Sequence, residues 1–275
     1  MSGRGTPRAS RFPMALDRLK SPDNVTSAAR EPLRPQRLLR EAAQDAARAV
    51  APTGIGLDSA PVRRRMVERL RAEGLGCEPV LDAMARVPRH AFVDTALAPQ
   101  AYEDTSLPIG HGQTISKPSV VAHMIGLLFD GAAARSSGQL GRVLEVGTGC
   151  GYQAAVLAAL AGEVVSVERL QALHQRAAAQ LTALAVPGLR LVFGDGMLGH
   201  APRAPYQSII AAAGGSELPS AWLEQLGIGG RLVAPMWQPG TQRQVLMVVD
   251  KAADGSLRRR AHDGVLFVPL KSGTL

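Results

Sequence analysis

The amino-acid sequence predicts an α/β fold: a three-layer sandwich with a doubly wound, mostly parallel, seven-stranded sheet between helices, and an N-terminal helical cap. Three observations lead to this prediction. From residue 141 onward, short β-branched runs alternate with stretches of helical periodicity. These runs are apolar almost throughout, which is typical of parallel strands buried on both faces. Ahead of them, residues 61–76, 77–92 and 118–129 have helical periodicity.

Residues 1–58 differ in composition from the rest of the chain. They are rich in Arg, Ala, Pro and Ser, and six prolines interrupt any helix longer than a few turns. Only residues 36–51 have the spacing of a short amphipathic helix. Organelle transit peptides are also Arg-rich, but they are poor in acids, whereas this segment has six. We therefore expect a flexible extension over 1–58 and one folded domain over 59–275.

Three helices are expected before the first strand. Residues 61–76 carry apolar side chains at helical spacing and end in glycines, and residues 77–92 repeat the pattern and stop near Pro88. Residues 118–129 form a strongly apolar third helix. The stretch LPIGHGQTIS, residues 107–116, is expected to be the loop that leads into it.

Strands and helices then alternate. Five strands are expected within GRVLEVG (141–147), EVVSVE (163–168), LRLVFGDG (189–196), YQSIIAAAG (206–214) and GGRLVAPM (229–236), with helices between successive strands except the third and fourth. Residues 131–141 are expected to form a polar linker. Residues 243–250 and 264–270 are expected to add two antiparallel strands at one edge.

The composition is that of a soluble globular protein. Hydrophobic residues make up 46% and charged residues 20%, and no run approaches the roughly 18 apolar residues of a membrane-spanning helix. No apolar secretory signal is present near residue 1. Cys77 and Cys150 are too few for a disulfide framework or a cysteine zinc site. We therefore expect a cytoplasmic protein without membrane association.

The net charge of +8 raises the question of nucleic-acid binding. Ten of the basic and six of the acidic residues lie in residues 1–60, so about half of the excess charge is there. Aromatic residues are only 4%, which leaves few side chains for stacking on bases. No specific nucleic-acid partner is therefore expected.

A glycine-rich turn follows the first strand. Gly147, Gly149 and Gly151 allow positive φ and let a ligand approach the backbone. Ligands bind at this carboxyl end of the strands in open α/β sheets. The spacing is G-x-G-x-G, whereas the dinucleotide fingerprint is G-x-G-x-x-G and position 152 is Tyr.

Acidic residues follow the next two strands. Glu168 lies about 20 residues after the glycines, where a carboxylate can accept ribose hydroxyls, and Asp195 is placed to reach an adenine amine. Two acids without a phosphate-binding basic residue favour a nucleoside without phosphate, as in S-adenosylmethionine, whose sulfonium would suit Glu145. The alternative is that Glu168 and Asp195 only cap helices.

Other chemistries lack their motifs. None of the three tyrosines is followed by lysine four positions later, as a short-chain dehydrogenase requires. Neither G-x-S-x-G nor the phosphate-binding G-x-x-x-x-G-K-[ST] is present. The six histidines have no metal-ligand spacing, so no metal is expected.

Five segments carry a family resemblance: LPIGHGQTISKP, VLEVGTGCGYQ, SVERL, FGDG and GVLFVPL, in that order. Together they resemble the protein-L-isoaspartate O-methyltransferases, a family of S-adenosylmethionine-dependent enzymes with a Rossmann-like fold. The resemblance covers roughly residues 61–275. The G-x-G-x-G turn marks such methyltransferases in general, whereas LPIG-x-GQTIS is specific to this family.

The resemblance implies methylation of the free α-carboxylate of L-isoaspartyl residues in damaged proteins and peptides, which initiates their repair. It implies a catalytic role for Ser116. The cofactor-binding residues that it implies are Gln113, Thr114, Ile115, Ser116, Glu145, Gly147, Gly149, Cys150, Glu168, Asp195 and Gly196.

Three single positions depart from the family pattern, and AAAGG (211–215) replaces the usual TAAAP-like run. Lys117 stands where Gln is usual, His200 where Trp is frequent and Gln207 where Asp is common. These departures leave the substrate contacts open but not the cofactor.

The chemistry explains why the polar stretch is useful. A carboxylate is a nucleophile at neutral pH, so no general base is required. Catalysis then rests on alignment and partial desolvation. We expect Ser116 to orient the carboxylate and Gly110 and Gly112 to let substrate backbone approach. Lys117 is expected to add electrostatic attraction. The alternatives are that Ser116 is a plain helix N-cap and that Lys117 is a solvated lysine.

Two other functions are kept open. One is a methyltransferase that acts on RNA or on a small carboxylic acid. The other is a non-catalytic, basic, nucleic-acid-binding protein on the same fold. The expected partners are isoaspartyl proteins and peptides, and the chain is expected to be a monomer.

Overall fold

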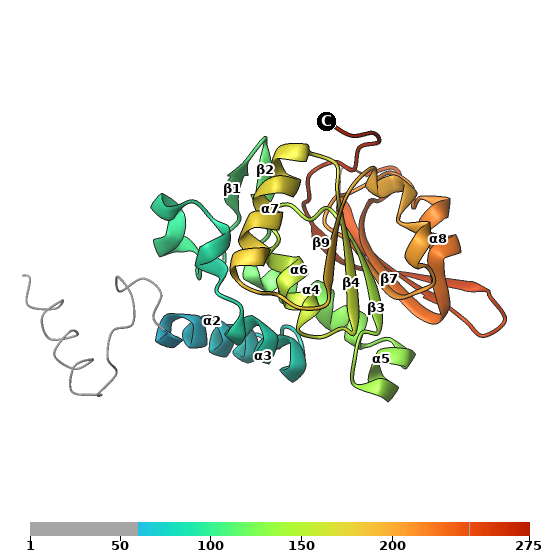
Figure 1. Cartoon of the computed structure of the whole chain (residues 1–275). Coiled ribbons are helices and arrows are strands. Elements are labelled where there is room, and N and C mark those ends of the chain that lie inside the picture. Colours follow the sequence, from blue (N-terminus) through green and yellow to red (C-terminus); the bar gives the residue numbers. More distant parts are fainter. Residues whose placement is uncertain (1–59, 242) are drawn as a thin grey trace, which may run out of the picture. The chain divides into compact units, whose positions relative to one another are not determined.

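A computed structural model describes residues 60–241 and 243–275, all of which belong to one unit, Pro52–Leu275. The amphipathic helix expected at 36–51 and the extension 1–58 lie outside the described residues. A seven-stranded sheet forms the middle layer, with helices on either side of it (Figure 1). This confirms the predicted α/β sandwich.

The sheet has the strand order β5-β4-β3-β6-β7-β8-β9. Its strands are β3 (Arg142–Val146), β4 (Glu163–Glu168), β5 (Leu189–Phe193), β6 (Tyr206–Ala211), β7 (Leu226–Trp237), β8 (Gln244–Lys251) and β9 (Leu257–Val265). The first five in chain order are parallel, and β8 and β9 are antiparallel additions. The chain moves outward from β3 to β4 and β5, then returns to the other side of β3 with β6.

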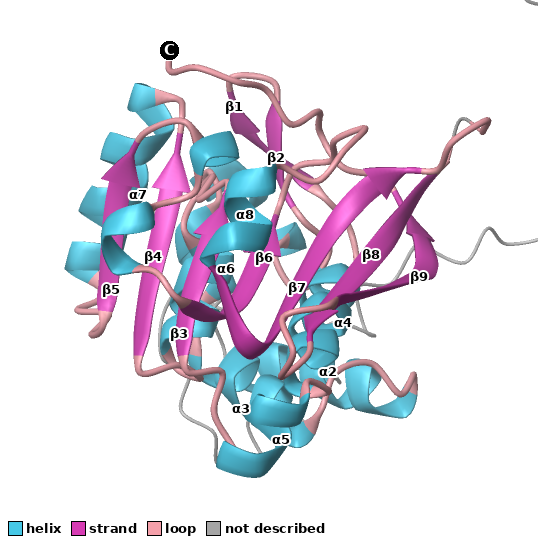
Figure 2. Ribbon diagram, turned by 90° about the vertical axis from the view of Figure 1, so that its right-hand side faces the viewer, coloured by secondary structure: helices cyan, strands magenta, loops and turns pink. Residues whose placement is uncertain are grey.

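The helices form two unequal layers (Figure 2). One layer contains α2 (Ala60–Ala72), α3 (Glu78–Arg86), α4 (Pro118–Phe129), α5 (Ala132–Ser137), α6 (Tyr152–Ala158) and α7 (Gln171–Ala183). The opposite face is covered by α8 (Ser220–Gln225). The helices α2 and α3 are those expected as the N-terminal cap, and eight of the twelve residues of the apolar helix α4 are buried.

Alternate side chains of each strand belong to different cores. Val143 and Val164 pack with the larger helical layer, whereas Leu144 and Val165 pack toward Trp222 of α8. All five side chains are fully buried. The near-continuous apolar strands of the sequence are therefore explained by burial on both faces.

The stretch LPIGHGQTIS was expected to be a loop but is a β-hairpin. Its strands β1 (Leu107–Gly110) and β2 (Gln113–Ile115) pair antiparallel through a turn in which Gly110, His111 and Gly112 have φ of 93°, 53° and 68°. The glycines conceal the strand pattern in the sequence, because they are required by the left-handed turn.

Two other predictions were wrong. The linker 131–141 contains the short helix α5, which ends at Gly138 in the left-handed conformation. The last strand covers residues 257–265 and not 264–270. Because β9 is an edge strand with mostly exposed side chains, it carries charged residues where a buried strand would be apolar. No helix in the described ranges is long and apolar enough to span a membrane.

Candidate active site

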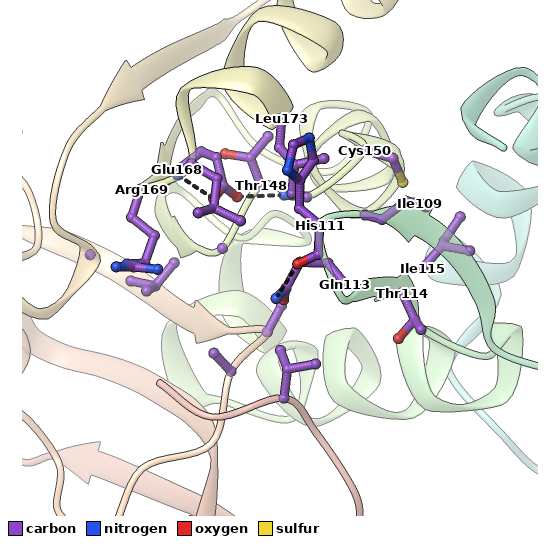
Figure 3. Close-up of a pocket in the computed structure, with 18 of the residues that line it drawn as sticks. Ile109, His111, Gln113, Thr114, Ile115, Thr148, Cys150, Glu168, Arg169 and Leu173 are labelled. Carbon is purple, nitrogen blue, oxygen red and sulfur yellow. Dashed lines mark hydrogen bonds between the residues drawn. The ribbon is translucent and has the colours of Figure 1, made fainter. Parts of the chain in front are cut away.

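A cavity of about 380 Å³ lies at the carboxyl ends of β3, β4 and β6. This is where ligands bind in open α/β sheets, because the strand order reverses between β3 and β6. One wall is the end of β4 with Glu168 and Arg169, and the facing wall is the hairpin with His111, Gln113 and Thr114 (Figure 3).

The turn from β3 to α6 forms the floor of the cavity. Gly147, Gly149 and Gly151 all have left-handed φ, at 92°, 55° and 93°. A Cβ added at Gly149 would lie 3.3 Å from Ile109 Cδ1, and one at Gly151 would lie 2.8 Å from Leu181 Cδ1. The turn therefore requires glycine both for its backbone angles and for the closeness of its neighbours.

Glu168 joins the end of β4 to this turn. Its side chain is buried, with Oε2 accepting from Gly149 N at 2.9 Å and Oε1 accepting from Leu170 N at 2.9 Å. Leu170 is the N-cap of α7, so the capping alternative describes one of its two oxygens. The carboxylate keeps free lone pairs on the cavity wall, because each oxygen can accept a second hydrogen bond.

Glu145 does not line the cavity, in contrast to the expectation that it faces a sulfonium. It is fully buried beneath the turn, where Ser166 Oγ donates to its Oε2 and Thr148 Oγ1 lies 2.6 Å from Ser166 Oγ. Burial raises the pKa of Glu145 to about 8, and hydrogen bonds from Ser166 and Gln153 oppose this only in part. At neutral pH the group is thus mostly a neutral carboxylic acid that supports Thr148.

Asp195 is also turned away from the cavity. Its Oδ1 accepts from Met197 N at 2.8 Å, and its Oδ2 accepts from Gly273 N at 2.6 Å. The neighbouring Gly196 does line the cavity. Both oxygens of Asp195 are thus bonded to backbone: Oδ1 caps the short helix Gly196–Leu198, as the capping alternative describes, and Oδ2 binds the C-terminal tail.

The hairpin brings the other predicted residues to the cavity. Gln113, Thr114, Ile115 and Ser116 all line it, as does Cys150 from the turn at its floor. Two residues that the sequence reasoning did not select, Ile109 and His111, line it as well. The sequence did not indicate that His111 lines the cavity, because the turn sets its left-handed backbone and thereby its place.

Ser116 is not the N-cap of α4. The N-cap is Lys117, with Pro118 at the first helical position and no side-chain cap from Lys117 itself. Asp104 binds the first turn instead, accepting from Ser119 N at 2.9 Å and from Ser119 Oγ at 2.8 Å. The Ser116 hydroxyl is therefore not used for capping.

Arg89 fixes the backbone of Ser116 by a hydrogen bond to its carbonyl. Its fully buried guanidinium donates from Nη2 to Ser116 O at 2.6 Å and from Nε to Ala101 O at 2.7 Å. It lies 4.8 Å above the centre of the Tyr152 ring. Burial lowers the pKa of Arg89 from its usual value. The available signal was the position of Arg89 among Val87, Pro88, Ala91 and Phe92, and it was not assigned a role from the sequence.

The tail 268–275 crosses the open side of the cavity. Val268, Pro269, Leu270, Lys271 and Leu275 contribute to its lining. Arg169 also lines it, but its guanidinium donates to the carbonyls of Gly273 and Ser272, at 2.8 and 3.3 Å. The tail carries no ligand motif, so its position could not be read from the sequence.

The departures from the family pattern lie in three different places. Gln207 is exposed near the amino end of β6, where its Oε1 accepts from Arg142 N, far along the strand from the cavity. His200 lies outside the cavity lining, and burial together with two arginines lowers its pKa. Lys117 borders a second hollow of about 630 Å³, which shares Thr114 and Ser116 with the cavity.

The strand order, the glycine turn and the acid at the end of β4 define the class: the protein has the fold of an S-adenosylmethionine-dependent methyltransferase. Within that class the family model for protein-L-isoaspartate(D-aspartate) O-methyltransferase matches residues 62–275. The chain belongs to this family, as its sequence motifs predicted.

Relatives and solved structures agree with this assignment. A protein-L-isoaspartate O-methyltransferase of Methylibium petroleiphilum is 58% identical over 266 residues, which are 97% of each chain. One of Leptothrix cholodnii is 56% identical, with 100% of this chain and 98% of the relative covered. A solved protein-L-isoaspartate O-methyltransferase is 26% identical with a TM-score of 0.65, over 76% of this chain and 66% of that one.

Proposed function

We propose that this protein transfers a methyl group from S-adenosylmethionine to the free α-carboxylate of L-isoaspartyl residues in damaged proteins and peptides. The observation that carries the proposal is the position of Thr114 and Ser116. Their hairpin separates the cavity at the sheet from the second hollow, and both residues line both spaces. A group bound in one space and a carboxylate bound in the other would meet at these hydroxyls.

The residues at the sheet fit S-adenosylmethionine. Glu168 offers unused acceptor positions for ribose hydroxyls, and Gly147 and Gly149 leave room for the ligand beside the backbone. The Arg169 guanidinium donates to carbonyls of the tail, so of the Lys and Arg residues in the lining only Lys271 is not bonded in this way. When bound, S-adenosylmethionine supplies an activated methyl group.

The residues of the chain act by positioning. Ser116 orients the substrate carboxylate through its hydroxyl, and Thr114 supports it, while Arg89 fixes the backbone that carries Ser116. No general base is needed, because an α-carboxylate is ionised at neutral pH. A hydroxyl holds the carboxylate without neutralising its charge, so the oxygen remains nucleophilic.

We revise the proposed site in two positions. Gln113, Thr114, Ile115, Ser116, Gly147, Gly149, Cys150, Glu168 and Gly196 are proposed to contact the cofactor or the substrate. Glu145 and Asp195 are proposed as positioning residues, since their side chains hold backbone and hydroxyl groups behind the wall. The catalytic domain is proposed to span 59–275.

The test is methyl transfer from labelled S-adenosylmethionine to paired peptides that differ only in isoaspartate or aspartate at one position. Base-labile label on the isoaspartyl peptide alone is the expected result. Cofactor binding without label on either peptide would contradict the substrate and would direct the search to RNA or small carboxylic acids.

We further propose a monomer that acts in the cytoplasm without a specific nucleic-acid partner. Both cysteines are free, which suits a reducing compartment. Light scattering of the purified chain and fractionation of cells test these two points.

A further inference from the structure

The second hollow lies beside the cavity, between the start of α4 and the segment after β9. Its lining includes Thr114, Ser116, Lys117, Arg243, Leu266 and Val268. The hollow thus continues from the two hydroxyls onto a basic and partly apolar surface.

The two basic side chains of this hollow are not compensated by acids. Among the described residues, neither the Lys117 ammonium nor the Arg243 guanidinium forms an ion pair or a side-chain hydrogen bond, and the lining contains no acid. The two acids beside it lie outside the lining: Asp104 accepts hydrogen bonds from Ser119 at the border, and Asp263 Oδ2 lies 3.2 Å from His123 Nε2. The hollow therefore presents positive charge to any ligand that enters it.

An apolar contact is available next to these charges. Leu266 is 85% exposed although it lies in an otherwise apolar segment. A large exposed apolar side chain in a concave, charged surface is typical of a site that contacts a partner. An extended peptide could place an apolar side chain on Leu266 and its backbone along the hollow.

We infer that the second hollow holds the peptide around the isoaspartyl residue and that Lys117 and Arg243 select substrates with acidic side chains beside it. This inference rests on the proposed function and names its preferred substrates. The carboxylate at Ser116 and a neighbouring Glu or Asp would then lie on one continuous basic surface. An exposed ion pair contributes about 0.2 to 1 kcal/mol, so two pairs correspond to a preference of roughly two- to thirtyfold.

The experiment uses three isoaspartyl peptides that carry Glu, Gln or Lys at the flanking positions and are otherwise identical. For the full chain we expect kcat/KM to be highest for the Glu peptide and lowest for the Lys peptide. The difference should reside in KM and shrink at high salt, because exposed charges are screened. Lys117→Gln combined with Arg243→Gln should bring the ratio of Glu to Gln peptide close to one.

The matched control is Arg259→Gln, which removes the same charge from an exposed position of β9 outside the hollow. It should keep the preference of the unaltered protein. Label on all three peptides with equal kcat/KM, or a preference that survives in the double variant, would overturn the inference and leave the proposed function standing. Absence of label from all three peptides would overturn the proposed function as well.

Discussion

The sheet side and the hairpin side of the cavity are built in different ways. The sheet side rests on a parallel ladder, and Glu168 ties its glycine turn to β4 through Gly149. The hairpin side has strands of four and three residues, and its backbone is fastened by long side chains, Arg89 at Ser116 O and Arg176 at Ile109 O. We propose that the two sides also differ in role: the sheet side binds the cofactor, and the hairpin side, which lines the same cavity, places the substrate.

The largest expected effect is that of replacing Arg89, whose guanidinium binds the backbone at the end of the hairpin. Arg89→Met leaves the carbonyls of Ala101 and Ser116 without their donor, and each buried unsatisfied group costs about 1 to 3 kcal/mol. We expect the free energy of unfolding in urea to fall by about 3 kcal/mol. Arg86→Met, at an exposed position of α3, is the control and should change it by less than about 0.5 kcal/mol. Equal losses in the two variants would contradict a special role for Arg89.

The next largest effect is expected from replacing Glu168 on the sheet side, and it concerns the affinity for the cofactor. Glu168→Ala removes a carboxylate that holds the glycine turn and faces the cavity, so S-adenosylmethionine binding should weaken about 100-fold, or about 2.7 kcal/mol. Calorimetric titration measures it. A second substitution, Glu163→Ala at the opposite end of β4, serves as control, since it lies outside the cavity lining. A normal affinity in Glu168→Ala would refute the assignment of cofactor binding to this wall.

Glu145, buried beneath the glycine turn of the sheet side, should make the stability of the chain depend on pH. The pKa of Glu145 is raised to about 8 in the folded chain, above its ordinary 4.5. Between these values the folded state binds the extra proton, so stability decreases as pH rises through this window and levels off above pH 8. Urea unfolding at pH 5.5 and 7.5 should show about 1 to 2 kcal/mol more loss for the unaltered chain than for Glu145→Gln. A parallel pH profile in the two proteins would exclude a buried, protonated Glu145.

The smallest expected effect concerns the hairpin hydroxyl alone. Ser116→Ala should lower kcat about tenfold, or about 1.4 kcal/mol, while the affinity for S-adenosylmethionine stays within about twofold. Rapid-quench kinetics with the isoaspartyl peptide separates the chemical step from binding. The control is Ser136→Ala on the exposed surface of α5, which should leave kcat unchanged. An unchanged rate in Ser116→Ala would contradict the orienting role.

The sheet side could be predicted from sequence because its requirements are local. Gly147 and Gly149 need left-handed angles, and Glu168 stands at the end of an apolar strand. The orientation of a buried acid depends on long-range neighbours, and for that reason the sequence did not show that Glu145 lies under the turn with Ser166.

The residues of the hairpin side were recognised in the sequence, but their secondary structure was not predicted correctly. LPIGHGQTIS identified the family, yet its strands were expected to be a loop because glycines hide the alternation of Leu107, Ile109 and Ile115. Arg89 and the tail 268–275 act through contacts that join distant parts of the chain. No spacing rule in a single sequence reports such contacts.

The hairpin has a consequence for how insertions and deletions would act. Thr114 and Ser116 are two residues apart, and Ile115 between them is buried. Ile115 lines the cavity alone, whereas Thr114 and Ser116 line both spaces, so a slip of one position would put the Ile115 side chain on the wall that the two spaces share. The left-handed turn at Gly110–Gly112 sets that register. We therefore expect that adding or removing one residue in this turn would replace a hydroxyl by a hydrocarbon side chain on that wall.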